Sequence, residues 1–479
     1  MRKTKIICTL GPATENLAEE LIEYGMDAAR VNFSHETYEI HAERIRNLKQ
    51  ARKKYDKPVP IIMDTRGPEI RTGKMKEEVW LQQGQQFILT AQEVVGDKNQ
   101  VHINPPHLIK KLQPGTDIFI DDGKIKLSVK EAVNDRLICQ VETGGYLSDK
   151  KGVNIPGLNF GIPCITETDR KDIEFALNLG IDYVAVSFVK NSGEINKLKK
   201  FLKSRDHSDV KVIAKIENRE AVQNIDHIIE AADGLMVARG DLGVELPLSE
   251  VPGIQKKIIR KCNQLGKPVI TATQMLESMN KNSIPTRAEA SDVANAVYDG
   301  TDVVMLSGET AAGQYPIKSL QTLVDILLKT EQEIDYEKEY YNKDRGEFEK
   351  EIVNIIGKTA TTAAYEISAR AITVSTKSGN TARMIARFRP DTPIIAVTID
   401  PRITRQLNLS WGVFPVEAEF VSELESLLSK LIECTQATSL VDQGDPVVII
   451  AGIPTGLTGK TNMLKIHNMG DPIVNSSET

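Results

Sequence analysis

The stretch Val210-Lys211-Val212-Ile213-Ala214-Lys215-Ile216-Glu217-Asn218 decides the fold and carries the first candidate site residues. Its apolar, largely β-branched residues lie between polar ones, a pattern typical of a short buried strand. Side chains two positions apart on a strand share a face, so Lys215 and Glu217 point the same way at its carboxyl end. Opposite charges on the inner side of a buried strand are costly unless they are paired or bind a ligand. The stretch therefore predicts either a structural ion pair or a ligand site.

The next apolar run changes the balance between these two interpretations. Gly234–Ala238 leads directly into Arg239-Gly240-Asp241-Leu242-Gly243, which places a second acid at a strand end. Gly240, beside Asp241, offers a backbone N–H that no side chain covers. A lysine, two carboxylates and bare backbone donors can hold a hard divalent cation together with an anionic oxygen. The pair of strands therefore favours a ligand site.

Length, composition and charge limit the class of protein. The chain has 479 residues, of which 41% are hydrophobic and 26% are charged, values typical of a soluble protein of two to four domains. The formal net charge of −6 argues against nucleic acid or an anionic membrane as partner. No apolar run is long enough to span a bilayer, and we expect no signal peptide. The five cysteines lack any metal-binding spacing, so we predict a reducing, cytoplasmic location.

The rhythm of apolar runs predicts a (β/α)8, or TIM, barrel. Eight strand-like runs alternate with helical segments and are interrupted once, after the third run. The eight runs cover residues 5–10, 28–33, 59–64, 183–188, 210–216, 234–238, 268–273 and 302–306. We assign residues 1–68 and 164–335 to this barrel, and an open doubly wound sheet is the alternative.

Two further domains are expected. Residues 69–163 contain short alternating runs and many turn residues, which predicts a small inserted β domain. Residues 336–479 alternate strands and helices again and are assigned to a C-terminal α/β domain. The expected strands of that domain cover residues 371–375, 393–398, 412–416, 446–451 and 462–467.

Polar motifs also follow the second and third barrel strands. They are Arg30-Val31-Asn32-Phe33-Ser34-His35 and Asp64-Thr65-Arg66-Gly67-Pro68-Glu69-Ile70-Arg71-Thr72-Gly73. Oxygen donors that carry few charges suit a hard cation of low charge, whereas arginines suit phosphate. The oxygen donors here are Asn32, Ser34, Asp64 and Thr65. Strand-end capping with exposed arginines is the alternative interpretation.

The last two barrel strands end in hydroxyl-rich motifs. In Thr271-Ala272-Thr273-Gln274-Met275, two hydroxyls two positions apart predict that Thr273 faces the substrate, and ordinary strand threonines are the alternative. Ser307-Gly308-Glu309-Thr310 either extends a polar network at the barrel mouth or caps the next helix.

Two segments of the C-terminal domain resemble phosphate sites. Ser375-Thr376-Lys377-Ser378-Gly379-Asn380-Thr381 lies between a strand and a helical run, where hydroxyls, a lysine and free N–H groups make a phosphate cradle. A plain N-cap loop is the alternative. Gly456-Leu457-Thr458-Gly459-Lys460-Thr461 resembles a P-loop ending, but Pro454 stands where that motif needs glycine, so we reject an NTP site there.

With these residues in view, the chain closely resembles the pyruvate kinase family. The motifs already quoted carry the resemblance, together with Lys151-Gly152-Val153-Asn154-Ile155-Pro156-Gly157 and Thr286-Arg287-Ala288-Glu289. It implies transfer of the phosphoryl group of phosphoenolpyruvate to ADP, the last step of glycolysis, in a barrel with an inserted β-barrel lid. It also implies a C-terminal effector domain within a homotetramer. Glu36 departs from the family pattern, in which glycine usually follows His35.

The resemblance also assigns the residues of the phosphoryl site. Glu217 and Asp241 correspond to the ligands of Mg²⁺ (or Mn²⁺). Lys215 corresponds to the cation that stabilises the phosphoryl group in flight. The backbone N–H groups of Gly240 and Asp241, with the Thr273 hydroxyl, correspond to the site of the phosphoenolpyruvate carboxylate.

The remaining assignments concern phosphate and nucleotide. By the same resemblance, Arg30 helps to bind the phosphate of phosphoenolpyruvate, and with Lys215 and Thr273 it completes the catalytic set. Arg71 and Lys151 face the nucleotide phosphates, and Asn32 and His35 complete the nucleotide side.

The resemblance further implies a K⁺ site and an effector site. The K⁺ ligands correspond to Asn32, Ser34, Asp64 and the carbonyl of Thr65, and Glu69 suggests dependence on K⁺. The loop from Ser375 to Thr381, which consists of Ser375, Thr376, Lys377, Ser378, Gly379, Asn380 and Thr381, would bind the phosphate of a sugar or nucleotide effector.

Two rival functions remain at this point. One is a Mg²⁺-dependent barrel lyase that acts through pyruvate enolate, which would have no use for Arg71, Lys151 or a lid. The other is a non-catalytic sensor of sugar phosphates, which would not need to retain Lys215, Glu217 and Asp241.

Overall fold

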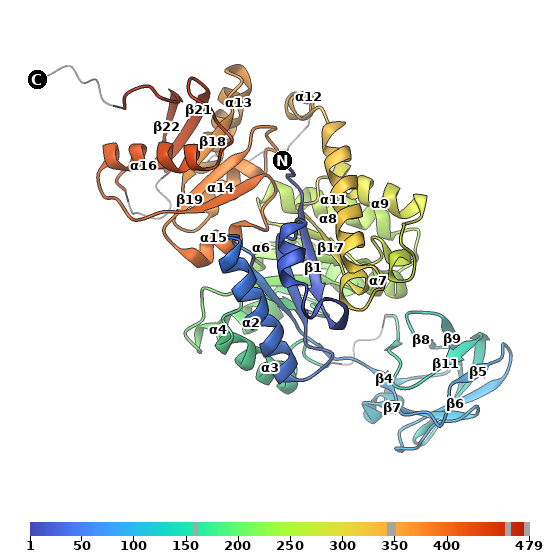
Figure 1. Cartoon of the computed structure of the whole chain (residues 1–479). Coiled ribbons are helices and arrows are strands. Elements are labelled where there is room, and N and C mark those ends of the chain that lie inside the picture. Colours follow the sequence, from blue (N-terminus) through green and yellow to red (C-terminus); the bar gives the residue numbers. More distant parts are fainter. Residues whose placement is uncertain (158–160, 343–350, 456–460, 474–479) are drawn as a thin grey trace, which may run out of the picture.

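A computed structural model describes residues 1–157, 161–342, 351–455 and 461–473 of the chain. Figure 1 shows a central barrel with an all-β domain at one end and an α/β domain at the other. The predicted ranges of the inserted domain (69–163) and the C-terminal domain (336–479) each include residues outside the described part. The P-loop-like segment also lies there, apart from Thr461.

The central body is a closed barrel of eight parallel strands, which confirms the predicted (β/α)8 fold. Its strand order around the ring is β1-β17-β16-β15-β14-β13-β3-β2. The strands are β1 Lys5–Leu10, β2 Ala28–Asn32, β3 Ile61–Asp64, β13 Tyr183–Val186, β14 Lys211–Ile216, β15 Gly234–Ala238, β16 Val269–Ala272 and β17 Val303–Leu306. Because all strands run the same way, their carboxyl ends meet at one mouth.

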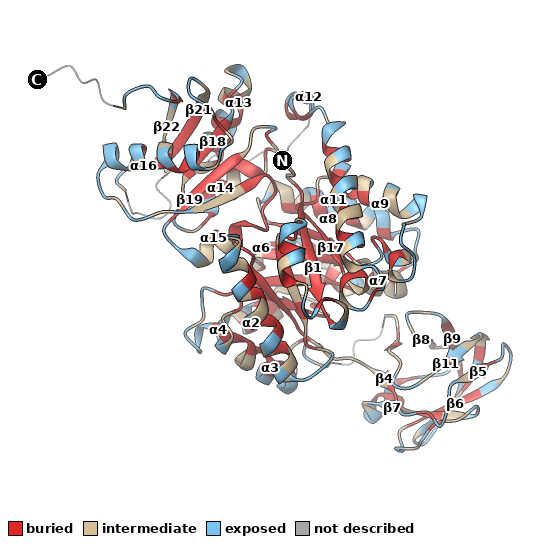
Figure 2. Cartoon of the chain, in the orientation of Figure 1, coloured by how far each residue is buried: buried red, intermediate tan, exposed pale blue. Residues whose placement is uncertain are grey.

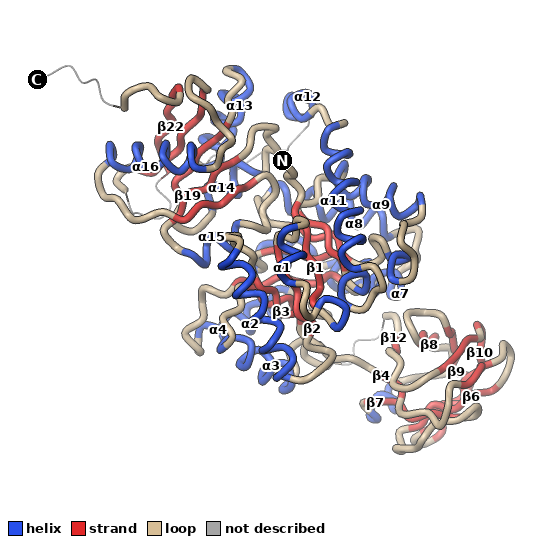
Figure 3. Tube along the Cα trace, viewed as in Figure 1, coloured by secondary structure: helices blue, strands red, loops and turns tan. Residues whose placement is uncertain are grey.

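Helices surround the barrel and bury one face each against it (Figures 2 and 3). They are α1 Ala18–Glu23, α2 Tyr38–Lys54, α3 Glu167–Asn178, α4 Ser192–Lys203, α5 Arg219–Gln223, α6 Ile225–Ala231, α7 Arg239–Glu245, α8 Val251–Gln264, α9 Arg287–Tyr298, α10 Gly308–Ala311 and α11 Pro316–Gln332. The next helix, α12 Tyr336–Asn342, lies beyond α11 (Figure 1) and contacts the C-terminal domain, where the Tyr340 hydroxyl donates to the Lys358 carbonyl oxygen. Short 3-10 turns lie at Pro12–Thr14 and Glu277–Asn280. The core between strands and helices consists of aliphatic side chains such as Leu21, Ile45 and Ile258.

A second apolar cluster fills the inside of the barrel. Side chains of the barrel strands, such as Ile62, Tyr183 and Met236, pack there with Leu409 from the C-terminal domain. Leu409 is fully buried, and the Tyr183 hydroxyl donates to the carbonyl oxygen of Gln406 at 2.8 Å. The C-terminal domain therefore contributes to the floor of the barrel, at the face opposite the mouth.

The inserted domain is built from β-strands around its own apolar core. Its strands are β4 Arg71–Thr72, β5 Val79–Leu81, β6 Gln86–Thr90, β7 Gln100–Asn104, β8 Asp117–Ile120, β9 Ile125–Val133, β10 Arg136–Thr143, β11 Gly145–Leu147 and β12 Val153–Asn154, with a 3-10 turn at Pro106–Lys111. Seven strands form one sheet in the order β12-β8-β9-β10-β6-β7-β4. Its two ends meet where the Val153 N–H donates to the Ile70 carbonyl at 2.8 Å, beside a bridge between Arg71 and Gly152.

The C-terminal domain is a five-stranded sheet with helices, as predicted. Its strand order is β20-β19-β18-β21-β22, and β22 alone runs antiparallel. The elements are α13 Ile352–Glu366, β18 Ala371–Ser375, α14 Asn380–Ala386, β19 Ile394–Thr398, α15 Pro401–Leu407, β20 Val413–Glu417, α16 Leu424–Ala437, β21 Pro446–Gly452 and β22 Thr461–Asn468. Within the described residues, every helix is too short or too polar to cross a bilayer.

Candidate active site

A buried charge cluster lies at the barrel mouth around Lys215, near the end of β14. The Lys215 ammonium lies 2.8 Å from Glu217 Oε1 and 3.2 Å from Asp64 Oδ1, and it donates to Ser187 Oγ at 2.7 Å. The side chains of Asp64 and Glu217 are only 1% exposed. The strand alternation that predicted a common face for Lys215 and Glu217 therefore brings them into direct contact. The ion-pair interpretation of this stretch is confirmed, and the ligand-site interpretation stays a prediction.

Burial and ion pairing shift the pKa values of Lys215 and Asp64 in opposite directions. Burial by itself lowers the pKa of the Lys215 ammonium, but the charges of Asp64 and Glu217 outweigh it and raise the pKa above its usual value. Burial likewise raises the pKa of Asp64, yet Arg30 and Lys215 together bring it below its usual value. The cluster thus keeps its lysine charged and its Asp64 carboxylate ionised at neutral pH.

Arg30 joins the cluster from β2. Its Nε donates to Asp64 Oδ2 at 2.6 Å, and its Nη1 donates to Thr9 Oγ1 at 3.1 Å. The Arg30 side chain remains 12% exposed, so it reaches the mouth. A guanidinium group that is held through Nε and Nη1 can still contact a bound phosphate through its remaining nitrogen.

Asp241 and Gly240 form a second part of the site, on the first turn of α7. Burial, with the charge of Glu217 as the next cause, raises the pKa of the Asp241 carboxyl to about 7. The Gly240 N–H donates to Thr273 Oγ1 at 2.8 Å, and that hydroxyl donates to the Ala272 carbonyl at 2.6 Å. Gly240 and Thr273, which we expected to lie at one site, are therefore in contact.

The reasoning that placed Thr273 on a strand face was wrong in its detail. Strand β16 ends at Ala272, and Thr273 has a φ of 64°, in the left-handed region. Thr271 lies inside the strand and bonds Thr301 Oγ1 at 2.9 Å in the buried core. The hydroxyl of Thr273 reaches Gly240 because the backbone turns there, and strand alternation plays no part.

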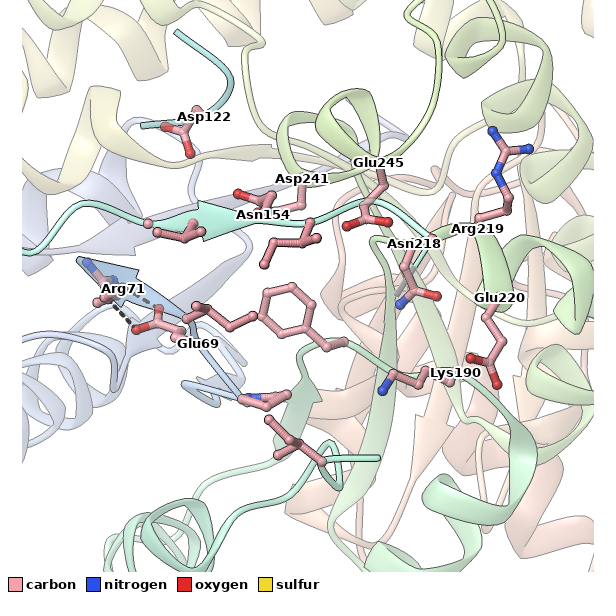
Figure 4. Close-up of a pocket in the computed structure, with 18 of the residues that line it drawn as sticks. Glu69, Arg71, Asp122, Asn154, Lys190, Asn218, Arg219, Glu220, Asp241 and Glu245 are labelled. Atoms are coloured by element: carbon pink, nitrogen blue, oxygen red, sulfur yellow. Dashed lines mark hydrogen bonds and ion pairs between the residues drawn. The ribbon is translucent and has the colours of Figure 1, made fainter. Parts of the chain in front are cut away.

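The inserted domain supplies one wall of a cleft of about 710 Å³ over this site. Figure 4 shows Arg71 and Glu69 joined by their ion pair on one side of the cleft and Asp241 on another. Arg71 Nε lies 2.7 Å from Glu69 Oε2, and Lys151 Nζ lies 3.0 Å from Asp121 Oδ1. The inserted domain therefore lines the cleft with two cations, each paired with a carboxylate, and an anionic ligand could share these cations or displace their partners.

The remaining predicted residues lie along β2 and the loop after it. His35 lines the cleft. Asn32 is the register partner of Asp64 across β2 and β3, and its Oδ1 accepts from the Ser34 N–H at 3.1 Å. The Thr65 carbonyl accepts from Ser187 Oγ at 2.9 Å. Polar oxygens of these residues thus gather beside the charge cluster.

Sequence reasoning missed Ser187 and the backbone of Phe188. Ser187 Oγ accepts from Lys215 and donates to the Thr65 carbonyl, so it links β13, β14 and the end of β3. The Phe188 N–H donates to Glu217 Oε2 at 2.5 Å. The signal that was available is the position of Ser187 at the carboxyl end of a barrel strand, where functional residues concentrate.

Ser307 resolves one of the open alternatives. It precedes α10, but its side chain makes no cap, and the Ser307 N–H donates instead to Glu309 Oε2 at 2.8 Å. The Ser307 hydroxyl is buried and has no hydrogen-bond partner in the described part of the chain. It is therefore available to a water or ligand at the mouth.

The donor set fits a hard divalent cation. Glu217 Oε1 is buried and lies 2.8 Å from the Lys215 ammonium, and Asp241 is close enough to Glu217 for the two charges to interact. The described residues contain no group of three or more His, Cys, Asp or Glu side chains that would bind a metal alone. Two carboxylates leave the other positions of an octahedral ion to water and substrate oxygens, which is how Mg²⁺ is commonly bound.

A second cavity, of about 580 Å³, lies in the C-terminal domain. Six of the seven residues of the predicted phosphate loop line it: Ser375, Thr376, Lys377, Ser378, Asn380 and Thr381. The seventh, Gly379, has a φ of 78° and donates its N–H to Thr376 Oγ1 at 3.0 Å. The rest of the lining includes Lys430 and the apolar side chains of Ile399 and Phe420.

Comparisons with known proteins agree with this architecture. The model of the pyruvate kinase barrel domain matches residues 1–320, and the model of the pyruvate kinase alpha/beta domain matches residues 354–467. The chain is a barrel phosphotransferase with a C-terminal α/β domain, and it belongs to the pyruvate kinase family.

Named relatives cover almost the whole chain. A pyruvate kinase of Geobacillus stearothermophilus is 47% identical over 476 residues, which are 98% of this chain and 81% of the relative. A pyruvate kinase of Bacillus licheniformis is 44% identical over 478 residues, covering 99% and 81%. A pyruvate kinase of Staphylococcus aureus strain MRSA252 is 46% identical over 481 residues, covering 99% and 82%.

Proposed function

We propose that this chain transfers the phosphoryl group of phosphoenolpyruvate to ADP, giving pyruvate and ATP. The observation that carries the proposal is the buried contact of Lys215 with Asp64 and Glu217, next to Asp241 and the cleft. Phosphoryl transfer needs positioning and charge neutralisation more than a strong base, and such a cluster provides both. The names of the relatives support the same reaction.

Phosphoenolpyruvate would bind at the mouth through its two anionic ends. Arg30 and Lys215 face its phosphate, and the N–H groups of Gly240 and Asp241, with the Thr273 hydroxyl, receive its carboxylate. Since Thr273 Oγ1 now accepts from the Gly240 N–H, the carboxylate would replace that contact when it binds. The hydroxyl remains beside the ligand and orients it.

Glu217 and Asp241 would hold Mg²⁺ or Mn²⁺. When bound there, such an ion would neutralise phosphate charge and the negative charge that develops on the enol oxygen. Lys215, fixed by Ser187 and its two carboxylates, stabilises the phosphoryl group during transfer. The Ser307 hydroxyl, which is buried and has no hydrogen-bond partner in the described part of the chain, would be available to water that carries a proton toward carbon.

The nucleotide would bind between the barrel and the inserted domain. Arg71 and Lys151 contact its phosphates after exchanging part of their pairing with Glu69 and Asp121. His35 and Asn32 complete this side of the cleft. We assign the inserted domain the role of a lid, because water at the site would compete with ADP for the phosphoryl group.

We further propose a K⁺ site formed by Asn32, Ser34, Asp64 and the Thr65 carbonyl. The observation that supports it is the gathering of these oxygens beside the phosphate-binding side chains. Replacing K⁺ with tetramethylammonium should depress activity strongly, because that ion is too large for the site. Full activity in tetramethylammonium would show that no K⁺ is needed.

The cavity of the C-terminal domain is the proposed effector site, for a phosphorylated sugar or nucleotide. Its hydroxyls and Lys377 support a phosphate cradle. The double variant Thr376→Ala/Ser378→Ala should lose activation by such compounds at subsaturating phosphoenolpyruvate and keep its basal rate. Unchanged activation would place the effector site elsewhere.

We also propose a cytoplasmic homotetramer. All five cysteines are buried and unpaired, which suits a reducing compartment. Large apolar side chains such as Leu248, Ile284 and Ile352 are 64–77% exposed in the single chain, which suits burial between subunits. Light scattering coupled to gel filtration would test the assembly, and a monomeric mass would contradict it.

A coupled assay with lactate dehydrogenase tests the proposed reaction. We expect pyruvate to form from phosphoenolpyruvate only when ADP is present, with one ATP made per pyruvate. Formation or cleavage of a carbon–carbon bond without ADP would instead favour the barrel lyase. Binding of sugar phosphates without turnover would favour the sensor.

A further inference from the structure

Glu36, the residue after His35, has a backbone conformation that its side chain disfavours. Its φ is 68°, in the left-handed region where a Cβ is strained and glycine is at ease. Such strain persists only where surrounding contacts hold it, and it concentrates at functional sites. The contacts of Glu36 show what maintains it here.

An ion pair to helix α2 holds Glu36 in place. The two terminal nitrogens of Arg44 donate to the two carboxylate oxygens, with Nη2 at 3.0 Å from Oε1 and Nη1 against Oε2. The Arg44 side chain is only 4% exposed, so its charge requires a partner. Glu15 also approaches, but it lies 3.7 Å from Nη2 and is 45% exposed. Glu36 is therefore the principal counter-charge of Arg44.

The same helix also holds the backbone of His35. His41 Nε2 lies 2.9 Å from the His35 carbonyl oxygen, and the His41 ring stacks on Phe33 with centroids 4.3 Å apart. Burial lowers the pKa of His41, so the ring is neutral and its Nε2–H donates to that carbonyl. These contacts fix the backbone before and after His35, whose side chain lines the cleft.

We propose that the Glu36–Arg44 ion pair is a positioning device that sets His35 for nucleotide binding. The inference rests on the proposed nucleotide role of His35. In the described part of the chain, neither Glu36 nor Arg44 forms a hydrogen bond or ion pair with Lys215 or Glu217. The pair therefore acts on the affinity for ADP and leaves the phosphoryl-transfer step alone.

Replacement of Glu36 by glycine separates the ion pair from the backbone conformation. Glycine adopts the observed φ without strain, so Glu36→Gly removes only the side chain that pairs with Arg44. We expect KM for ADP to rise roughly three- to tenfold, with kcat and KM for phosphoenolpyruvate within about twofold of the parent values. Glu36→Gln, which keeps the shape but loses the charge, should show a smaller rise. Glu43→Gln is the control, because it removes the same charge from an exposed neighbour of Arg44.

His35→Ala and the double variant His35→Ala/Glu36→Gly complete the test. If Glu36 acts through His35, the double variant should have the KM for ADP of His35→Ala alone. A raised KM in His35→Ala with an unchanged KM in Glu36→Gly would overturn the inference and keep the nucleotide role of His35. An unchanged KM in His35→Ala would refute that role, and the inference with it. Equal rises in Glu36→Gly and Glu43→Gln would reduce the effect to general charge and also overturn it.

Discussion

Lys215→Met tests the charge cluster on which the proposed reaction depends. The variant keeps an apolar chain of similar length but removes the ammonium that lies 2.8 Å from Glu217 and 3.2 Å from Asp64. Losing one preorganised donor at a site of developing charge costs about 3–4 kcal/mol, so kcat should fall roughly 10²- to 10³-fold. Lys211→Met, on the opposite end of the same strand, is the matched control and should keep its kcat.

The same variant should lose stability in a way that depends on pH. Asp64 keeps Arg30 at 2.6 Å, so the loss falls mainly on Glu217, which is left buried without a cation. Removing one partner of a buried pair costs about 3–5 kcal/mol, and we expect the lower end because the Phe188 N–H still bonds Glu217.

The sign of the pH effect follows from proton linkage. In the parent, the depressed pKa of Asp64 gives stability above its unfolded value of about 3.9, and this is lost only as pH falls through the lower folded value. In Lys215→Met, an unpaired buried carboxyl has a raised pKa, so the folded variant gains stability when it takes up a proton. The gap in thermal midpoint between parent and variant should therefore be wider at pH 7.5 than at pH 5.5. Near-normal kcat, or a gap of the same size at both pH values, would refute this account of the cluster.

Three other expectations concern single groups. Ser187→Ala should lower kcat about tenfold with little change in thermal midpoint, since one hydroxyl that positions Lys215 is lost; an unchanged kcat would contradict this. Burial lowers the pKa of Lys5 to about 8, so the unfolded chain binds more protons between pH 8 and about 10.4 and parent stability rises across that window. Lys5→Met should thus be more stable at pH 7 by up to about 3 kcal/mol and lose that advantage by pH 10, and a constant advantage would exclude the mechanism. Because burial raises the pKa of Asp241 to about 7, Mg²⁺ bound at the proposed site would have to displace a proton below that value. Calorimetry should show about tenfold weaker Mg²⁺ binding at pH 6 than at pH 8, and equal affinities would count against it.

The fold could be predicted from sequence because buried parallel strands leave a strong local pattern. Each of the eight apolar runs contains a barrel strand, and the expected and observed bounds of Lys5–Leu10 and Gly234–Ala238 are identical. Lys215 and Glu217 could be paired for the same reason, since strand alternation is local. Local helix and strand patterns are therefore sufficient to locate the barrel mouth.

The rest depended on backbone turns and distant partners that no local pattern encodes. Thr273 reaches Gly240 only because its φ is positive, which a threonine gives no sign of. Ser187 shows its role only once Lys215 and Thr65 are seen on either side of it. The left-handed backbone of Glu36 likewise has an explanation only once its ion pair with Arg44 is known.

The position of Leu409 has a consequence for synthesis of the chain. This side chain completes the packing inside the barrel, yet it lies far beyond β17 in the order of translation. A nascent chain that has just released its eighth strand from the ribosome therefore has an unfinished barrel floor, with Ile62 and Tyr183 lacking one of their neighbours. A fragment that stops after β17 would therefore expose apolar surface at the barrel floor and tend to aggregate.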